Sequence, residues 1–500
     1  MSDGADRLSC MSPPRFLFAD QLGPHFDDGG PIVLVEATAV LGQRTYHRAK
    51  AHLILSALRH RARELGDRVE FLRTEHYRDV LTGRDLEVIN PTSWGARALV
   101  AELGAQVLPS RGFVTSESDF VDWAAGRPAS RLVMEQFYRS VRTSTGVLMR
   151  GPESEGGRFN YDQDNRQPPP KGASSLGLPD IWAPVEDDID AEVRRDLDRL
   201  VAEGRVHLIG SDGPRRFAAT RKEALAALND FIETRLADFG PFEDASLTGD
   251  SNMAHSRLSV PLNLGLLHPQ EVIDAVVAAY HGGGTHGPPL ASVEAVVRQI
   301  MGWRDWVWHL YWHLGERYVV ESNFLTANEP LPAAFLELNG AGVEARCLSH
   351  VLDEVNRTGW AHHIQRLMIL GNWSLQRGYQ PAALSNWFIN AFVDGTPWVM
   401  PANVVGMSQH ADGGIVATKP YASGGAYISK MTDFCGGCRF NPKVRLGPDA
   451  CPFTAGYWAF LDRVEPRIRG NHRMSQPLAG LRRLVDREAV VAQERDRTNW

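Results

Sequence analysis

Short apolar runs alternate with amphipathic stretches in the first quarter of the chain. Residues 15–22, 31–37 and 69–74 have the length and composition of buried strands. Residues 47–65 repeat apolar positions near the helical period, and residues 92–110 combine a second amphipathic stretch with a further apolar run. This alternation predicts a parallel sheet with helices on its faces. No G-x-G-x-x-G follows the first apolar run, so the sequence does not indicate an NAD-type Rossmann site.

The pattern changes after residue 150. A segment rich in Gly, Pro and polar residues gives way near residue 187 to helical periodicity, which continues to the end of the chain. We therefore expect an α/β domain followed by an all-α domain. The expected regions are a disordered tail (1–13), an α/β domain (14–145), an interdomain linker with a long loop and helices (146–235) and a helical domain (236–500).

Composition narrows the class of protein. With 500 residues, 43% of them hydrophobic, the chain is long enough for two or three domains with large cores. It has no apolar run of about 18 residues and no apolar leader, which predicts a protein without a membrane span or secretion signal. Five cysteines in such a chain predict a cytoplasmic location, where clustered cysteines serve metal or redox chemistry rather than disulfides.

Charge is distributed unevenly. The net charge of −7 argues against a uniformly basic nucleic-acid-binding protein. Residues 346–500 nevertheless carry 18 Lys and Arg against 12 Asp and Glu, whereas residues 1–345 carry 35 against 48. A basic C-terminal third suits a phosphate backbone. On charge alone, an arginine-rich solvated face is the commoner explanation.

Three of the five cysteines gather in one short segment. Cys435 and Cys438 form a C-x2-C knuckle, and Cys451 follows, directly before a proline. Three thiolates leave a tetrahedral site incomplete, and Cys347 is a better fourth candidate than Cys10, which lies in the expected tail. Zinc and an iron–sulfur cluster both accept four thiolates. A single knuckle with two lone cysteines favours a [4Fe–4S] cluster, with zinc and unliganded cysteines as the alternatives.

Two segments carry polar residues next to expected helices. Serines surround Arg257 just before one helix, where N–H groups and hydroxyls bind phosphates; an ordinary capped helix explains them equally well. The adjacent His362 and His363 begin an apolar helix. Such histidines donate protons or bind metal, and packing alone also accounts for them.

The C-terminal part is rich in aromatic residues. Ten of the 13 tryptophans lie at or after position 303, and core packing on helices is the favoured explanation. Stacking on a cofactor or on bases, or one-electron transfer, is the alternative. In one segment Trp387, Asp394, Trp398 and Asn403 follow in close order. Carboxylate and amide groups beside aromatic rings suit a heterocycle such as a flavin, and buried structural polar groups are the alternative.

Taken in order, these and other segments resemble the photolyase/cryptochrome family, and specifically its iron–sulfur bacterial branch with the prokaryotic (6-4) photolyases. The resemblance covers nearly the whole chain. It rests on "FADQL", "GGRFNYDQDNR", "SRLSVPLNLGLL", "GWRDWVWHLYW", "AHHIQRLMILGN", "NVVGMSQHADGG", "KPYASGGAYISKM" and "CGGCRFNP…ACPF". Each segment is modest alone, and the ordered set is specific.

The resemblance implies an N-terminal α/β antenna domain with a Rossmann-like parallel sheet, a linker and an all-α FAD-binding domain. It implies a U-shaped FAD that is bound by Ser256, Arg257, Leu258, Ser259, Arg366, Asn372, Asp394 and Asn403. It also implies a [4Fe–4S] cluster with the ligands Cys347, Cys435, Cys438 and Cys451. Three residues fall at the substrate: His362, His363 and Tyr421. Two fall on the electron-transfer route: Trp387 and Trp398.

The function implied by the resemblance is light-driven repair of (6-4) pyrimidine–pyrimidone photoproducts in UV-damaged DNA. Excited, reduced FAD gives an electron to a photoproduct flipped out of the duplex. A protonated histidine, His363 in this chain, gives a proton and regains it. We expect a monomer in the cytoplasm, at the nucleoid when DNA is bound. A blue-light photosensor of the same fold and a non-photochemical cluster protein that binds nucleic acid are the alternatives.

The chain departs from the family pattern at several positions. Asn339 and Phe388 stand where relatives carry redox-active aromatic residues, which predicts an altered electron relay. Met400 replaces a polar or acidic residue near flavin N5 and cannot exchange a proton with the flavin. Val40 and Gln43 replace the residues expected around a lumazine. A 6,7-dimethyl-8-ribityllumazine antenna is therefore expected to bind weakly or not at all.

Overall fold

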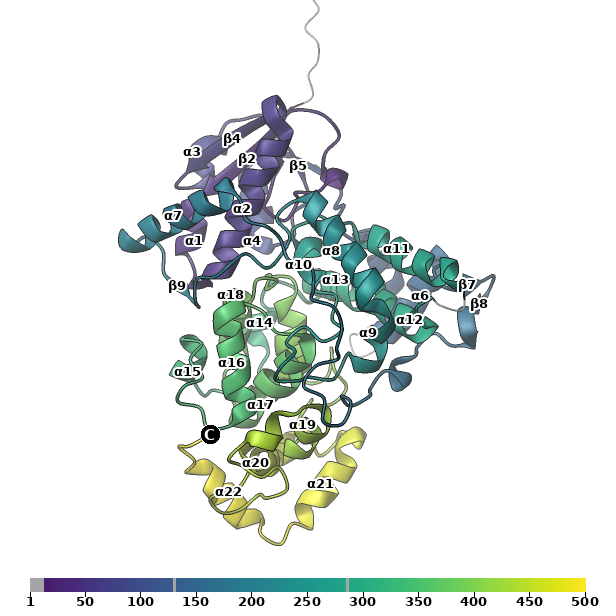
Figure 1. The fold of residues 1–500 in the computed structure, drawn as a ribbon, viewed down its shortest axis with the longest axis vertical. Helices are drawn as coiled ribbons and strands as arrows, with labels where there is room; N and C mark the ends of the chain where they lie inside the picture. The colour runs from purple at the N-terminus through teal and green to yellow at the C-terminus, as the bar shows by residue number, and fades with distance from the viewer. Residues whose placement is uncertain (1–12, 129–131, 285–286) are drawn as a thin grey trace, which may run out of the picture.

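The N-terminal part of the computed structural model is a five-stranded parallel sheet (Figure 1). The structure describes residues 13–128, 132–284 and 287–500, so almost all of the expected tail, Cys10 included, lies outside the described residues. Neighbouring strands are parallel throughout, in the order β4-β2-β1-β5-β6. The strands are β1 (Arg15–Leu17), β2 (Ile32–Ala37), β4 (Val69–Thr74), β5 (Glu87–Ile89) and β6 (Gln106–Leu108).

Helices cover both faces of this sheet. Alternate residues of its strands point to opposite faces, so Leu17 and Leu34 pack with α2 (Arg48–Leu65), whereas Phe16 and Val33 pack with α4 (Trp94–Leu103). All six residues of β2 are buried, as expected for a strand with helices on each side. The predicted combination of an α/β domain with a helical remainder is confirmed.

The two parts of the chain interleave. From the expected linker, α7 (Asp188–Ala202) packs on α2, and β9 (Leu208–Ile209) pairs with β3 (Tyr46–His47). Conversely, α5 (Glu117–Ala124) and α6 (Met134–Thr145) pack on α13 (Asp305–Leu314) in the helical part. The ring of Phe120 lies 4.7 Å from that of His309 in α13. Linker segments therefore complete the α/β domain, and helices from the α/β region of the sequence pack on the helical domain.

The remainder of the chain is helical (Figure 1). Its first helices are α8 (Arg221–Thr234), α9 (Leu236–Phe242), α10 (Ser259–Asn263), α11 (Pro269–Gly282), α12 (Leu290–Val297), α14 (Tyr318–Glu321) and α15 (Ala333–Leu336). They are followed by α16 (Arg346–Thr358), α17 (Asn372–Arg377), α18 (Pro381–Ala391), α19 (Gly425–Met431), α20 (Pro452–Ile468), α21 (Ser475–Arg482) and α22 (Arg487–Arg495). Along the described ranges, no helix combines the length and apolarity that a membrane crossing requires.

π-helical turns interrupt the helices at residues 298–304, 365–371 and 401–408. Such turns are rare and frequently lie at functional sites. Two of the three carry a residue expected at the cofactor, Arg366 and Asn403. The predicted core role of the tryptophans is confirmed in α13, where Trp306 and Trp308 are fully buried.

Candidate functional site

Asp394, in the turn after α18, is the centre of a polar cluster. Both terminal nitrogens of Arg366 donate to its carboxylate, at 2.8 and 3.2 Å. The hydroxyl of Ser259 donates to the same carboxylate at 2.7 Å, and the side chain of Asn263 donates to the Asp394 carbonyl at 3.1 Å. The structure thus brings together three of the residues expected at FAD, from three segments distant in sequence.

The α/β domain reaches the same turn through Lys50 of α2. Its Nζ is buried and donates to the carbonyl oxygens of Ile389 and Gly395. Burial lowers the pKa of Lys50 to about 7, although the nearby Asp394 carboxylate opposes this. The sequence does not distinguish Lys50 from other polar residues of an amphipathic helix, because both of its partners lie more than 300 positions away.

Replacing Lys50 with Met is expected to lower the free energy of unfolding by about 1–3 kcal/mol, because two buried carbonyls lose their donor. The pKa of this lysine falls from 10.5 to about 7 on folding, so the unfolded chain binds the extra proton between these values. Stability should therefore rise with pH across this window in the wild type, and this part of the rise should vanish in K50M. Urea unfolding at pH 7 and pH 9 checks both effects.

The matched control is Lys222→Met, which removes an exposed lysine on α8. Equal stability of K50M and K222M would show that Lys50 does not support the turn around Asp394.

Arg257 is a cation that pairs with a backbone carbonyl rather than with a carboxylate. It donates to the carbonyl of Arg216 at 2.7 Å, lies 4.4 Å over the ring of Phe217, and leaves its Nε without a partner. Burial and the neighbouring arginines lower its pKa to about 10. Leu258, which precedes α10, offers this helix no side-chain cap. Binding of a negatively charged ligand therefore explains this loop better than helix capping does.

The two asparagines predicted to bind FAD form side-chain hydrogen bonds with the protein backbone. Asn372 donates to the carbonyl of Ser423 at 2.9 Å and accepts from its N–H at 3.1 Å. Asn403, in its π-helical turn, donates to the carbonyl of Val399 just before that turn, at 2.8 Å. Asn372 thus anchors the loop that carries Tyr421, and Asn403 keeps its amide oxygen and its second N–H for a ligand.

His362 and His363 lie in different environments. His362 is 1% exposed, and neither of its ring nitrogens has a hydrogen-bond partner. Burial and the adjacent His255 hold the pKa of His362 well below its usual value. The half-exposed side chain of His363 lies 3.4 Å from the carboxylate of Asp244. Burial lowers the pKa of His363, but this ion pair outweighs it and the net shift is upward. Of the two histidines, His363 is thus the one whose protonated form this pocket favours.

Other polar groups surround the two histidines. The ring of His255 stacks on that of His362 at 4.3 Å. The side chain of Tyr421 is partly exposed. Its partial burial and the charges of Asp162 and Asp244 raise its pKa, whereas the charge of Arg166 lowers it, and the net shift is upward. The sequence patterns did not single out His255 or Asp244. The only available signal was that His255 directly precedes Ser256 in the serine-rich segment around Arg257.

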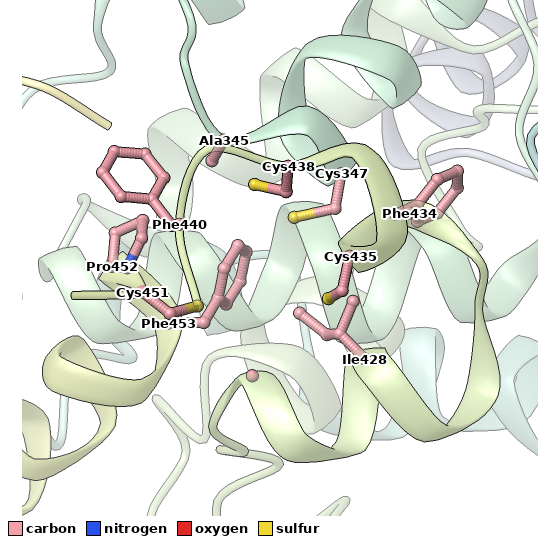
Figure 2. A pocket seen from close by; sticks show the side chains of 11 residues that line it. Ala345, Cys347, Ile428, Phe434, Cys435, Cys438, Phe440, Cys451, Pro452 and Phe453 are labelled. Carbon is pink, nitrogen blue, oxygen red and sulfur yellow. The ribbon is translucent and has the colours of Figure 1, made fainter. Parts of the chain in front are cut away.

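Four cysteines line one pocket. In Figure 2 their sulfur atoms point toward a common space. Cys347 is the second residue of α16, Cys435 and Cys438 form the knuckle, and Cys451 directly precedes α20. The wall of the pocket is apolar and includes Ile428, Phe434, Phe440 and Phe453. The structure therefore brings together all four predicted ligands, and all four are free thiols.

The spacing of the sulfurs distinguishes between one ion and a cluster. A zinc ion about 2.3 Å from each sulfur would hold the sulfurs about 3.8 Å apart. Among the described residues, only two groups have three candidate ligand atoms within 4.8 Å of one another, one around His255 and one around His60. Neither group includes a cysteine, so no three of the four sulfurs lie this close together. Burial also raises the pKa of Cys435 to about 11, so a bound cationic centre is needed to keep the thiolates. The pocket fits a larger iron–sulfur cluster better than a single zinc ion.

The two tryptophans expected on the electron-transfer route lie in different hydrophobic clusters. Trp387 donates to the carbonyl of Phe335 at 2.6 Å, and its ring lies 5.1 Å from that of Phe335. Trp398 packs against Trp308, and the guanidinium of Arg304 lies 4.9 Å over its ring. A cation over the ring disfavours loss of an electron, so Trp398 would lose an electron less readily than Trp387, and the electron-transfer roles of both stay predictions.

The positions that depart from the family pattern have ordinary structural roles. Phe388 stacks on Phe392 at 5.1 Å, and Met400 is buried in the same cluster. Asn339 is exposed and accepts a hydrogen bond from a backbone N–H two residues on. Val40 packs against the sheet, whereas its neighbour Gln43 is exposed. The altered relay and the weak lumazine binding stay predictions.

Comparisons with known proteins find relatives of this chain. A family model described as deoxyribodipyrimidine photo-lyase-related protein matches residues 16–205. A (6-4) photolyase from Agrobacterium fabrum is 39% identical over 512 residues, which cover 95% of this chain and 96% of the relative. A crystal structure of a class III photolyase from Agrobacterium tumefaciens has a TM-score of 0.53 and 16% identity over 83% of each chain. A Synechocystis sp. PCC6803 cryptochrome has a TM-score of 0.54 and 13% identity over 93% of this chain and 92% of its own.

Proposed function

Because the chain belongs to the photolyase/cryptochrome family, we propose that it repairs (6-4) pyrimidine–pyrimidone photoproducts in UV-damaged DNA with the energy of light. The observation that carries this proposal is the ion pair of His363 with Asp244, beside a buried His362 whose ring nitrogens are both free. Such a pocket offers one proton donor and one unpaired polar ring to a base that enters it. Illumination of the protein with DNA that contains a single (6-4) photoproduct tests the proposal.

The residues around Asp394 and Arg257 suit FAD. Arg257, with its unpaired Nε, would bind the pyrophosphate together with the hydroxyl of Ser256. Arg366 and Ser259 hold Asp394 in one orientation, so its carboxylate would meet the donor edge of a ring system without reorganisation. Reduced FAD, when bound and excited by light, supplies the electron that destabilises the photoproduct. The protein's own part is to fix the ligand and to exclude water.

His363 performs the proton transfer in this proposal. Its ion pair with Asp244 keeps it charged, and its half-exposed position lets it reach a base that has left the duplex. His362 offers two nitrogens without partners to the same base. Tyr421 lies at the edge of the pocket, within the field of Arg166 and Arg473. These two cations suit the phosphates next to a flipped nucleotide.

The four cysteines are proposed to hold a [4Fe–4S] cluster with a structural role. Their sulfurs come from α16, from the knuckle at 435–438 and from the residue before α20, so a cluster would bind three separate segments together. The apolar wall of the pocket keeps water from the sulfurs.

The ion pair of His363 predicts the pH dependence of repair. Because the pKa of His363 lies above its ordinary 6.5, repair should stay constant at low pH and fall as the pH rises through this raised pKa. Asp244→Asn removes the charge that holds the proton, so the fall should move to lower pH. At pH values above the pKa of His363 in both proteins, D244N should repair about 10-fold more slowly than the wild type for each unit by which the substitution lowers this pKa. Single-turnover repair between pH 6 and pH 9 measures the shift.

Asp85→Asn, an exposed carboxylate in the α/β domain, is the control and should leave the profile unchanged. A D244N profile that coincides with the wild type would exclude His363 as the proton donor.

A further inference from the structure

His255 belongs to the histidine pocket, and the repair reaction described above gives it no role. Its ring is buried and stacks on His362 with centroids 4.3 Å apart and an angle of 19° between the planes. It meets His363 edge-on, at 5.6 Å. The three side chains form the only histidine trio among the described residues whose ligand atoms lie within 4.8 Å of one another.

Packing alone sets the orientation of the His362 ring. Neither of its nitrogens has a hydrogen-bond partner, so no directional bond fixes the angle of the ring. His363 touches it only edge-on, at 6.3 Å and 68°. Of the two ring contacts of His362, only the one with His255 is flat, and a flat contact favours a single plane for the ring that carries the free nitrogens.

His255 is itself held by the backbone. Its Nδ1 lies 3.1 Å from the carbonyl oxygen of Asn252, and its Nε2 lies 3.1 Å from that of Glu243. Burial and the charge of His363 lower the pKa of His255 to about 4, which keeps the extra proton on His363 beside Asp244. A neutral ring donates from one nitrogen only, so one of the two carbonyls accepts a hydrogen bond and holds the ring, while the other faces a nitrogen lone pair and adds no bond. A rigid, uncharged ring is thus built against His362.

We propose that His255 is a positioning residue for repair, which holds the ring of His362 so that its free nitrogens face the flipped base. This inference rests on the proposed photolyase function. His255 does not touch the substrate in this arrangement; it acts through the ring plane of His362. A misplaced catalytic group of this kind typically costs up to about 100-fold in rate without an equal loss of binding.

Three substitutions separate stacking from hydrogen bonding. H255F keeps a flat ring and loses both nitrogens, H255N keeps one donor and loses the ring, and H255A loses both. If the stack positions His362, repair per absorbed photon should fall about 10-fold or more in H255A and H255N, and H255F should recover most of it. Affinity for the photoproduct should stay within about threefold of the wild type. A purely structural hydrogen-bond role would reverse the order, with H255N repairing better than H255F.

A second readout does not depend on repair. In protein labelled with ¹³C at the histidine ring, the His362 signal should shift in H255A and H255N and stay near its wild-type position in H255F. Wild-type protein that fails to repair would overturn the proposed function, while this spectrum would still decide whether His255 orients His362. Wild-type repair in H255N, or an unmoved His362 signal in H255A, would overturn the positioning role. If H255F fails to fold, H255N alone decides the question.

Discussion

Replacing His363 with glutamine is expected to lower light-driven repair about 10²–10⁴-fold while flavin and DNA remain bound. Glutamine keeps a polar side chain of similar length but cannot carry the proton that Asp244 stabilises on the imidazole. The loss should appear in the rate of repair per absorbed photon rather than in the affinity for the photoproduct. Single-turnover repair under saturating DNA, together with a binding titration in the dark, separates the two quantities.

The control for this substitution is His207→Gln, which changes an exposed histidine of the linker. H207Q should repair like the wild type. Repair by H363Q at the wild-type rate would mean that another group supplies the proton. Loss of affinity in proportion to the loss of rate would show that His363 binds the lesion without donating to it.

Replacing Cys438 with alanine is expected to abolish the iron–sulfur centre and to lower the melting temperature by on the order of 10 °C. Cys438 is half-buried, so the loss of packing at this position is small compared with the loss of a ligand. Without the centre, three thiols whose pKa values are raised by burial remain against an apolar wall and no longer bind their segments together. Iron and sulfide analysis, visible absorption and a thermal melt check the prediction.

Cys10→Ala removes the fifth cysteine and is the control, with iron content and melting temperature expected to match the wild type. Metal analysis that finds one zinc per chain, or unchanged iron in C438A, would refute the proposed cluster. Because the sulfurs are too widely spaced for a single ion, the first of these outcomes would also require the pocket to contract.

The sequence predicted the elements with strong local signals. The apolar runs located β1, β2 and β4, because buried strands of a parallel sheet need continuous apolar residues. β5 was missed because its three residues begin with Glu87 and are too few to form a pattern. The two-residue pairing of β3 with β9 was invisible for the same reason, and only the register of the folded chain shows it.

The site was predictable where a motif is local and was missed where long-range contacts create it. The knuckle cysteines and the paired histidines stand out in the sequence itself. Lys50 and His255 do not, because their roles depend on partners in other segments: Lys50 contacts residues beyond position 380, and His255 stacks on His362. Asp244 likewise gains its importance only from the distance of 3.4 Å to His363. No local pattern encodes such a contact.

Repair of a defined photoproduct is the most direct test of the proposed function. The purified protein, with its flavin reduced, is mixed with an oligonucleotide that carries one (6-4) photoproduct, illuminated with blue light and analysed by chromatography against a dark sample. We expect the original pyrimidines to return in light and only in light, with H363Q inactive under the same conditions. Bound flavin and an intact cluster without any loss of photoproduct would contradict repair and would identify the protein as a photosensor of the same fold.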